Sequence, residues 1–206
     1  MLQLKGRVNS SNVMKALWAL DEIGLEYERE DVGGKFGKNN QTPYLSLNPN
    51  GRIPTVIDGD LVLWESNSIV RYLASTHSLG DLCPADPTAR ARCEMWMDWQ
   101  LTELVDSMVP VFHGLIRQSE KERDLDGINI ARDIWSKKWR ILDDHLSRNQ
   151  YVGSDQFTMA DIPIGPIAYR WYELPIIRED FKNLRRWYDS LCTRPAFQKH
   201  IMTGLS

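Results

Sequence analysis

The sequence predicts an α/β unit followed by an all-helical unit. Short apolar or β-branched runs, which are typical of strands, occur only before residue 78. From residue 89 onward apolar residues recur at helical spacing instead. The stretch between them, 78–88, contains a glycine and two prolines and shows no periodicity, as expected of a linker. We therefore expect two domains, 1–77 and 89–206, joined by a linker at 78–88.

The first domain is predicted to begin with a strand, a helix and a second strand. Residues 2–5 alternate between apolar and polar, as a short strand would. Residues 13–24 carry apolar residues along one helical face and end at a glycine, which is a common helix stop. Residues 25–32 alternate weakly and predict another strand, and the glycine- and lysine-containing segment 33–40 predicts a loop.

A hairpin and a helix are predicted to complete this domain. The apolar runs 54–57 and 61–63 flank Asp58-Gly59-Asp60, and Asp-Gly between two such runs favours a hairpin. An apolar run at helical spacing follows, and Ser66 is expected to be its N-cap. This order of elements is a thioredoxin-like layout that ends near His77.

The second domain shows helix signals only. One long amphipathic helix is predicted, and its buried stripe is Ile128, Ala131, Trp135, Trp139, Leu142 and Leu146. Another helix is expected to start at Thr158 as N-cap, with Asp161 at its third position in a variant of the capping box. We expect Asp161 to be structural rather than catalytic.

Composition argues against several classes of protein. The formal charge of −3 and the lack of Lys/Arg clusters argue against nucleic-acid binding. No apolar run approaches the ~20 residues that cross a membrane, and the N-terminus has no signal-like core. Cys83, Cys93 and Cys192 are an odd, scattered set without a disulfide or dithiol pattern, and the histidines lack metal-ligand spacing. We expect a cytoplasmic protein without a metal site.

The segment 48–72 combines features that suit a peptide-like ligand. Ile53 precedes a proline and is therefore held extended, which leaves its main-chain N–H and C=O available to a partner. The helix start after Ser66 presents unpaired N–H groups that suit a carboxylate, and Glu65 suits an ammonium group. The alternative interpretation is a plain hairpin followed by a capped helix.

The same segment resembles a known family. Asn-Pro-Asn-Gly-x-Ile-Pro-Thr-Val from Asn48, then Leu-Trp-Glu-Ser-x-x-Ile-x-x-Tyr-Leu-Ala from Leu63, is similar to the glutathione-binding half of cytosolic glutathione transferases. The segment from Gly6 to Lys15 resembles a theta-related bacterial subgroup, and segments around 157–162 and 184–197 resemble the family's helical domain, so the likeness spans nearly the whole chain. The resemblance implies detoxification chemistry, a homodimer, and a cis bond before Pro54. It also implies glutathione contacts at Arg52, Ile53, Pro54, Glu65 and Ser66.

Glutathione transfer requires a thiolate, because the thiol is a poor nucleophile with a pKa of about 8.5. The segment after the first strand offers hydroxyl and amide donors at a predicted helix start, namely Ser10, Ser11 and Asn12. It has neither Tyr nor Cys, which excludes the mechanisms of the family that use those residues. The alternative role of these three residues is to cap the helix. Which of them would contact the sulfur stays open.

Further contacts are suggested by position within the family. Lys38 and Asn40 resemble loop residues that reach the glycine carboxylate of glutathione. The electrophile pocket is expected between the segment 6–12 and the helical domain. Its candidate residues are Val8, Met108, Phe112, His113, Arg117 and Trp171.

Three functions are compatible with such a site. The first is conjugation of glutathione to small hydrophobic electrophiles. The second is a glutathione-dependent peroxidase or thiol–disulfide activity of the same thiolate. The third is a non-catalytic protein that keeps the fold and binds glutathione or another ligand.

Overall fold

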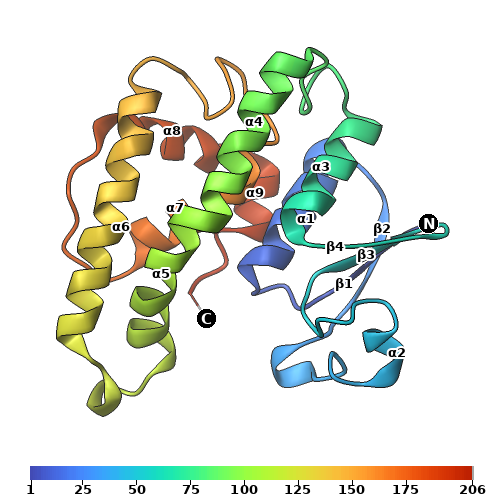
Figure 1. The fold of residues 1–206 in the computed structure, drawn as a ribbon, viewed down its shortest axis with the longest axis horizontal. Coiled ribbons are helices and arrows are strands. Elements are labelled where there is room, and N and C mark those ends of the chain that lie inside the picture. Colours follow the sequence, from blue (N-terminus) through green and yellow to red (C-terminus); the bar gives the residue numbers. More distant parts are fainter. Residues whose placement is uncertain (206) are drawn as a thin grey trace.

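The computed structural model describes residues 1–205, in which four strands form one sheet in the order β2-β1-β3-β4 (Figure 1). The strands are β1 Leu2–Lys5, β2 Tyr27–Glu30, β3 Thr55–Asp58 and β4 Leu61–Trp64. β1 pairs in parallel with β2 and antiparallel with β3, and β3 pairs antiparallel with β4. The predicted strand, helix, strand, hairpin and helix are therefore confirmed.

The helices of this part lie against the sheet. They are α1 Ser11–Ile23, the short α2 Thr42–Leu45 and α3 Ser66–His77, with a 3₁₀ turn at Gly34–Phe36. Leu2 and Leu4 of β1 share one face, since side chains alternate along a strand, and both are buried in the core with α1 and α3. Gly24 ends α1 with a φ of 79°, a left-handed conformation in which a glycine is unstrained.

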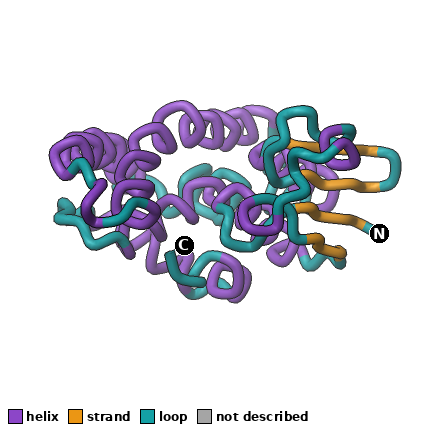
Figure 2. The backbone as a smooth tube through the Cα atoms, turned by 90° about the horizontal axis from the view of Figure 1, so that it is seen from below, coloured by secondary structure: helices purple, strands orange, loops and turns teal. Residues whose placement is uncertain are grey.

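The second half of the described chain is helical. Its helices are α4 Pro87–Trp99, α5 Val105–Phe112, α6 Leu125–Leu146, α7 Asp161–Glu173, α8 Lys182–Cys192 and α9 Pro195–His200. α4 runs into α5 through a π-helical stretch at Gln100–Leu104, and a second one at His113–Arg117 follows α5. Figure 2 shows the strands gathered at one end of the molecule and the helices of the second half at the other. Among residues 1–205, no helix is both long and apolar enough to cross a membrane.

The predicted apolar stripe of α6 is confirmed, because all of its residues are buried. Trp135 and Trp139 pack there with Trp171 of α7, with ring centroids 4.9 Å and 6.1 Å from that indole. Such an aromatic cluster buries a large apolar area. Trp171 is therefore part of the core, and its expected place in an electrophile pocket is wrong.

α1 joins the two halves of the molecule. It packs against α3 on one side and against α7 and α9 on the other. Trp18 of α1 meets Phe197 of α9 edge to face at 4.9 Å, and it lies so close to Gly165 of α7 that a Cβ there would be 2.5 Å from the indole. Every residue from Val13 to Leu20 is buried, so α1 lies at the centre of the fold.

Two predicted helix starts need correction. Ser66 is the first residue of α3, and Glu65 occupies the N-cap position with a φ of 69°. α7 begins at Asp161 with Ala160 as its N-cap, and Thr158 lies in the turn before it. The reason is the tight turn at 158–161, in which the Asp161 main-chain N–H donates to the Thr158 carbonyl at 3.0 Å before the helix begins.

Asp161 has the structural role that the sequence predicted. Its buried carboxylate accepts hydrogen bonds from the Val152 N–H (2.9 Å), the Thr158 N–H (2.9 Å) and the Trp187 indole N–H (2.7 Å). One side chain therefore ties a loop, the start of α7 and α8 together. Burial raises the pKa of this carboxyl to about 6, which leaves it mostly ionised at neutral pH.

We predict that Asp161→Ala lowers the free energy of unfolding by about 3 kcal/mol or more, because three buried donors lose their acceptor. Urea denaturation followed by circular dichroism measures this loss. The control is Asp144→Ala on the exposed side of α6, which should change stability by less than about 0.5 kcal/mol. Equal effects of the two substitutions would contradict the role given to Asp161.

Candidate active site

A cleft opens between the N-terminus of α1 and the helices α5 and α7. Its volume is about 170 Å³, which is small for a ligand site. It is lined by Arg7, Ser10, Ser11, Asn12, Val105, Met108, Val109, Phe112, His113, Arg117, Ile167 and Arg170. The three predicted sulfur-contacting residues thus share one cleft with Met108, Phe112, His113 and Arg117 of the predicted electrophile pocket.

The start of α1 presents its polar side chains to this cleft. Ser10 occupies the N-cap position, yet its hydroxyl makes no capping hydrogen bond within the described chain. Its carbonyl accepts from the Met14 N–H at 2.8 Å, so the main chain starts the helix. The sequence also allowed a simple capping role for Ser10, but its side chain does not cap the helix.

A hydrogen bond connects the starts of the two helices. The Ser66 hydroxyl at the start of α3 donates to the Asn12 side-chain oxygen at 3.3 Å. The N-terminal ends of both helices carry unpaired N–H groups and the positive end of the helix dipole. Their meeting at this point makes a region suited to an anionic group such as a thiolate or a carboxylate.

The segment before β3 is anchored by side-chain hydrogen bonds. The Ile53–Pro54 bond is cis, as the resemblance implied. The Arg52 carbonyl accepts from the Tyr44 hydroxyl (2.6 Å) and from the Asn48 side-chain amide (2.8 Å). Among residues 1–205, no hydrogen bond reaches the main-chain N–H or C=O of Ile53. This residue can therefore pair with an extended ligand in the manner of a neighbouring strand.

Glu65 adopts a backbone conformation that is unusual for a residue with a side chain. Its φ of 69° lies in the left-handed region, which costs on the order of 1–3 kcal/mol outside glycine. Such strain is typical of binding sites. Here the turn at Glu65 directly precedes the first N–H groups of α3.

Beneath this turn lies a buried lysine. The Lys15 side chain is completely inaccessible to solvent, and its ammonium group donates to the Ser66 hydroxyl (3.4 Å), Asn67 Oδ1 (3.1 Å) and Gln100 Oε1 (3.0 Å). Burial lowers the pKa of Lys15 to about 7, and the nearby Glu65 partly counters that shift. Lys15 therefore connects α1, the start of α3 and the helical half below the site.

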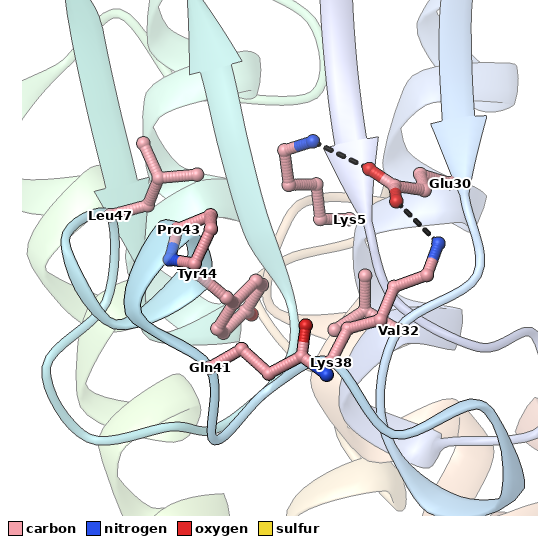
Figure 3. Close-up of a pocket in the computed structure, with 8 residues that line it drawn as sticks. All are labelled: Lys5, Glu30, Val32, Lys38, Gln41, Pro43, Tyr44 and Leu47. Atoms are coloured by element: carbon pink, nitrogen blue, oxygen red, sulfur yellow. Dashed lines mark hydrogen bonds and ion pairs between the residues drawn. The ribbon is translucent and has the colours of Figure 1, made fainter.

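Lys38 and Asn40 lie at a different place. Lys38 is ion-paired with Glu30 (2.6 Å) beside a second pocket, in which Lys5 also pairs with Glu30 (2.7 Å), as Figure 3 shows. Asn40 accepts from the Asn39 side-chain amide at 3.1 Å. The structure does not bring either residue to the cleft, so their role towards a glycine carboxylate stays a prediction.

Val8 of the predicted electrophile pocket is about half exposed, at 49%, and is not among the residues that line the cleft, so its role stays a prediction. Sequence reasoning also missed five residues that line the cleft, which are Arg7 from the loop before α1, Arg170 from α7, and the apolar Val105, Val109 and Ile167. Arg170 stands among apolar residues in a helix that is buried nearly throughout. A charged residue in such an apolar stretch is the feature of the sequence that could have indicated a functional role.

Comparison with known proteins agrees with this geometry. The family model for the N-terminal domain of glutathione S-transferase matches residues 2–75, and that for the C-terminal domain matches residues 87–190. The chain therefore belongs to the glutathione S-transferase family, as the sequence motifs predicted. It is 38% identical over its whole length, and over all of the relative, to glutathione S-transferase GstB of Escherichia coli K12. It is 32% identical to glutathione S-transferase 3 of Zea mays, with 97% of this chain and 93% of the relative covered.

Solved structures give the same result. A theta class glutathione S-transferase from Xanthomonas axonopodis pv. citri, crystallised with glutathione bound, superposes with a TM-score of 0.96 at 42% identity. The match covers all of this chain and 99% of the other. The predicted fold, a thioredoxin-like domain followed by a helical domain, is confirmed, and so is the assignment to a glutathione transferase.

We predict that Lys15 makes the stability of the protein depend on pH. Its pKa in the folded chain, about 7, lies below the ordinary 10.5, so the unfolded chain binds more protons between these values and stability rises with pH there. From pH 7 to pH 9 the gain from this group should be roughly 2 kcal/mol. Urea titrations at both pH values give the free energy of unfolding of the wild type and of Lys15→Met. The contribution of Lys15 is the increase from pH 7 to pH 9 in the wild type minus the increase in the variant.

The matched control for Lys15 is Lys137→Met, on an exposed position of α6, which should keep the wild-type increase. A Lys15→Met protein whose stability rises with pH as steeply as the wild type would contradict the assignment.

Proposed function

We propose that this chain binds glutathione along Arg52, Ile53, Pro54, Glu65 and Ser66 and conjugates its thiolate to small hydrophobic electrophiles. The observation that carries the proposal is the 3.3 Å hydrogen bond between Ser66 and Asn12. It brings the start of α3, where the resemblance places the amino-acid end of glutathione, next to the donors of α1. The bound glutathione named for the Xanthomonas relative supports the same ligand here.

The proposed chemistry needs few groups. Glu65 would pair with the ammonium group of glutathione, the first N–H groups of α3 with its adjacent carboxylate, and the main chain of Ile53 with its extended middle. The Ser10 hydroxyl and Asn12 amide, at the positive end of the α1 dipole, would donate to the sulfur and stabilise the thiolate. The electrophile would then occupy the cleft, where proximity and thiolate stabilisation lower the barrier.

Three organisational features belong to the proposal. We infer that residues 1–77 form the glutathione-binding domain, 78–88 a linker and 89–206 the domain that contributes the electrophile pocket. We also infer a cytoplasmic location. We infer a homodimer as well, as the family resemblance implies, and take Met95 of α4, which is 57% exposed, as a candidate interface residue.

We predict that bound glutathione has a thiol pKa about two units below the free value of about 8.5. Asn12→Ala should raise the pKa of the bound thiol by about 1 unit, because one hydrogen bond to the charged sulfur is lost. The ultraviolet absorbance of the thiolate, followed against pH without any electrophile present, measures this pKa independently of turnover. Ser10→Ala in the same assay shows how much of the thiolate stabilisation comes from Ser10 and how much from Asn12.

The control for this titration is Asn129→Ala, on an exposed position of α6 far from the start of α1. It should leave the pKa of the bound thiol unchanged. Tight glutathione binding with an unshifted thiol pKa in the wild type would reject the proposed catalysis and favour a ligand-binding protein.

We predict that the purified protein has twice the 23.9 kDa mass of one chain by size-exclusion chromatography with light scattering. Met95→Glu should shift the distribution towards the single-chain mass if α4 lies in the interface, because a charge would be buried there. A wild-type protein that elutes with the mass of one chain at micromolar concentration would contradict the dimer.

A further inference from the structure

The cleft carries an excess of positive charge that conjugation of a purely hydrophobic electrophile does not require. Arg7, Arg117 and Arg170 line it together with His113, and no Asp or Glu is among its lining residues in the described chain. Among residues 1–205, no ion pair joins any of these three guanidinium groups to a carboxylate. Several arginines elsewhere in the chain, among them Arg29, Arg71 and Arg132, are paired with acids.

Arg170 is the most unusual member of this group. Its side chain comes from the buried helix α7, and the residue is only 9% exposed. Its guanidinium stacks over the Phe112 ring at 3.8 Å, and its one polar contact in the described structure is with the Met108 sulfur at 3.5 Å, a weak acceptor. A buried guanidinium normally has a carboxylate or other strong acceptor, because burying an unpaired charge is costly.

Arg7 and Arg117 approach the same place from other elements. Arg117 follows α5 and lies over Phe112 at 5.6 Å, so one aromatic ring contacts two guanidinium groups. Arg7, from the loop before α1, donates to Asn9, while its Nε is buried without a hydrogen-bond partner among residues 1–205.

The charges also disfavour one another. Burial is the main cause that lowers the pKa values of Arg7, His113 and Arg170, and the charge of Arg117 lowers each of them further. Bringing like charges together weakens a fold unless a counter-charge enters, and a bound anion would supply it. The guanidinium fork is the group best shaped to bind a planar carboxylate or a sulfonate.

We propose that the cleft selects electrophiles that carry an anionic group, a carboxylate or sulfonate on a small apolar or aromatic body, and that Arg117 and Arg170 bind this group. The apolar part would rest on Val105, Val109 and Ile167. This inference rests on the proposed function for its chemistry, but the anion site itself is independent of it.

With an organic halide that carries the anionic group as the electrophile, the reaction would be a nucleophilic displacement. The glutathione sulfur, having released its proton to solvent, forms the new C–S bond with its electron pair. The carbon–halogen bond breaks and the halide leaves with that pair, so no oxidant or reductant is needed. The arginines bind the anionic group both before the displacement and in its transition state, and they thereby select the substrate.

The test uses two pairs of aromatic probes, and the members of each pair are similar in size and shape but differ in charge. Calorimetric titration with unreactive 3,5-dinitrobenzoate and 3,5-dinitrobenzamide, on glutathione-saturated protein, measures the anion site without turnover. We expect the benzoate to bind at least ten times more tightly, which corresponds to about 1.4 kcal/mol, and this preference to shrink at high salt. Rates with 4-chloro-3,5-dinitrobenzoate and its amide, each divided by the uncatalysed rate, should show the same preference.

The variants are Arg117→Gln, at an exposed position, and Arg170→Gln, at the buried one. Each should reduce the benzoate-over-benzamide preference about tenfold, because a charged partner of the anion is lost. The control is Arg148→Gln, which removes one arginine charge just after the C-terminal end of α6, outside the cleft. It should keep the benzoate-over-benzamide preference. Because Arg117 is exposed, its variant tests the inference even if Arg170→Gln does not fold.

Equal affinity for acid and amide in the wild type would overturn the inference, and so would an Arg148→Gln effect as large as that of Arg117→Gln. Benzoate binding to the glutathione-free protein that is absent from the glutathione-saturated protein would also overturn the inference, since the arginines would then bind the carboxylates of glutathione itself. A clear binding preference without any turnover would support the anion site and reject the proposed conjugation instead.

Discussion

The structure depends on the burial of the middle of α1. Every residue from Val13 to Leu20 is buried between α3 and the helices α7 and α9. This burial includes a lysine, which is costly unless the charged group is hydrogen-bonded. Lys15 meets that requirement with oxygens of Ser66, Asn67 and Gln100. The position of α1 is therefore fixed by both apolar packing and a specific polar network, and the start of α1 is fixed with it.

That constraint explains why the site is assembled from distant segments. The donors at the start of α1 are placed against the start of α3 by the same helix that forms the centre of the core. The Lys15 network runs directly below the Glu65–Ser66 turn, where the backbone is held in a left-handed conformation. A rigid support of this kind is what a binding site with a strained turn needs, because the surrounding packing must hold the unfavourable backbone in place.

The two sides of the cleft have different physical characters. The side at the start of α1 offers hydroxyl and amide donors and a helix N-terminus beside Arg7, and Asn12 of this side is hydrogen-bonded to Ser66 at the start of α3. The side from α5 and α7 combines an aromatic ring with guanidinium groups, a combination that suits a ligand with an apolar body and a negative charge. Arg170 is especially informative, since a helix that is otherwise packed in the core has no structural need for an unpaired cation.

The amino-acid sequence was sufficient for the order of elements, the buried stripe of α6 and the motif around Pro54 and Glu65. These features depend on residues that are close in sequence, where turn chemistry and periodicity act directly. Local reasoning was less exact at helix starts: it placed N-caps at Ser66 and Thr158, because cap preferences do not show where the preceding turn ends.

Only the tertiary structure decided which distant side chains meet. It placed Trp171 in the core and left Val8 outside the cleft. It also brought Arg7, Arg117 and Arg170 into one cleft although they lie far apart in the chain. The periodicity of a helix tells which face is apolar, but the partners of that face depend on how helices pack, and packing is set by contacts between segments remote in sequence.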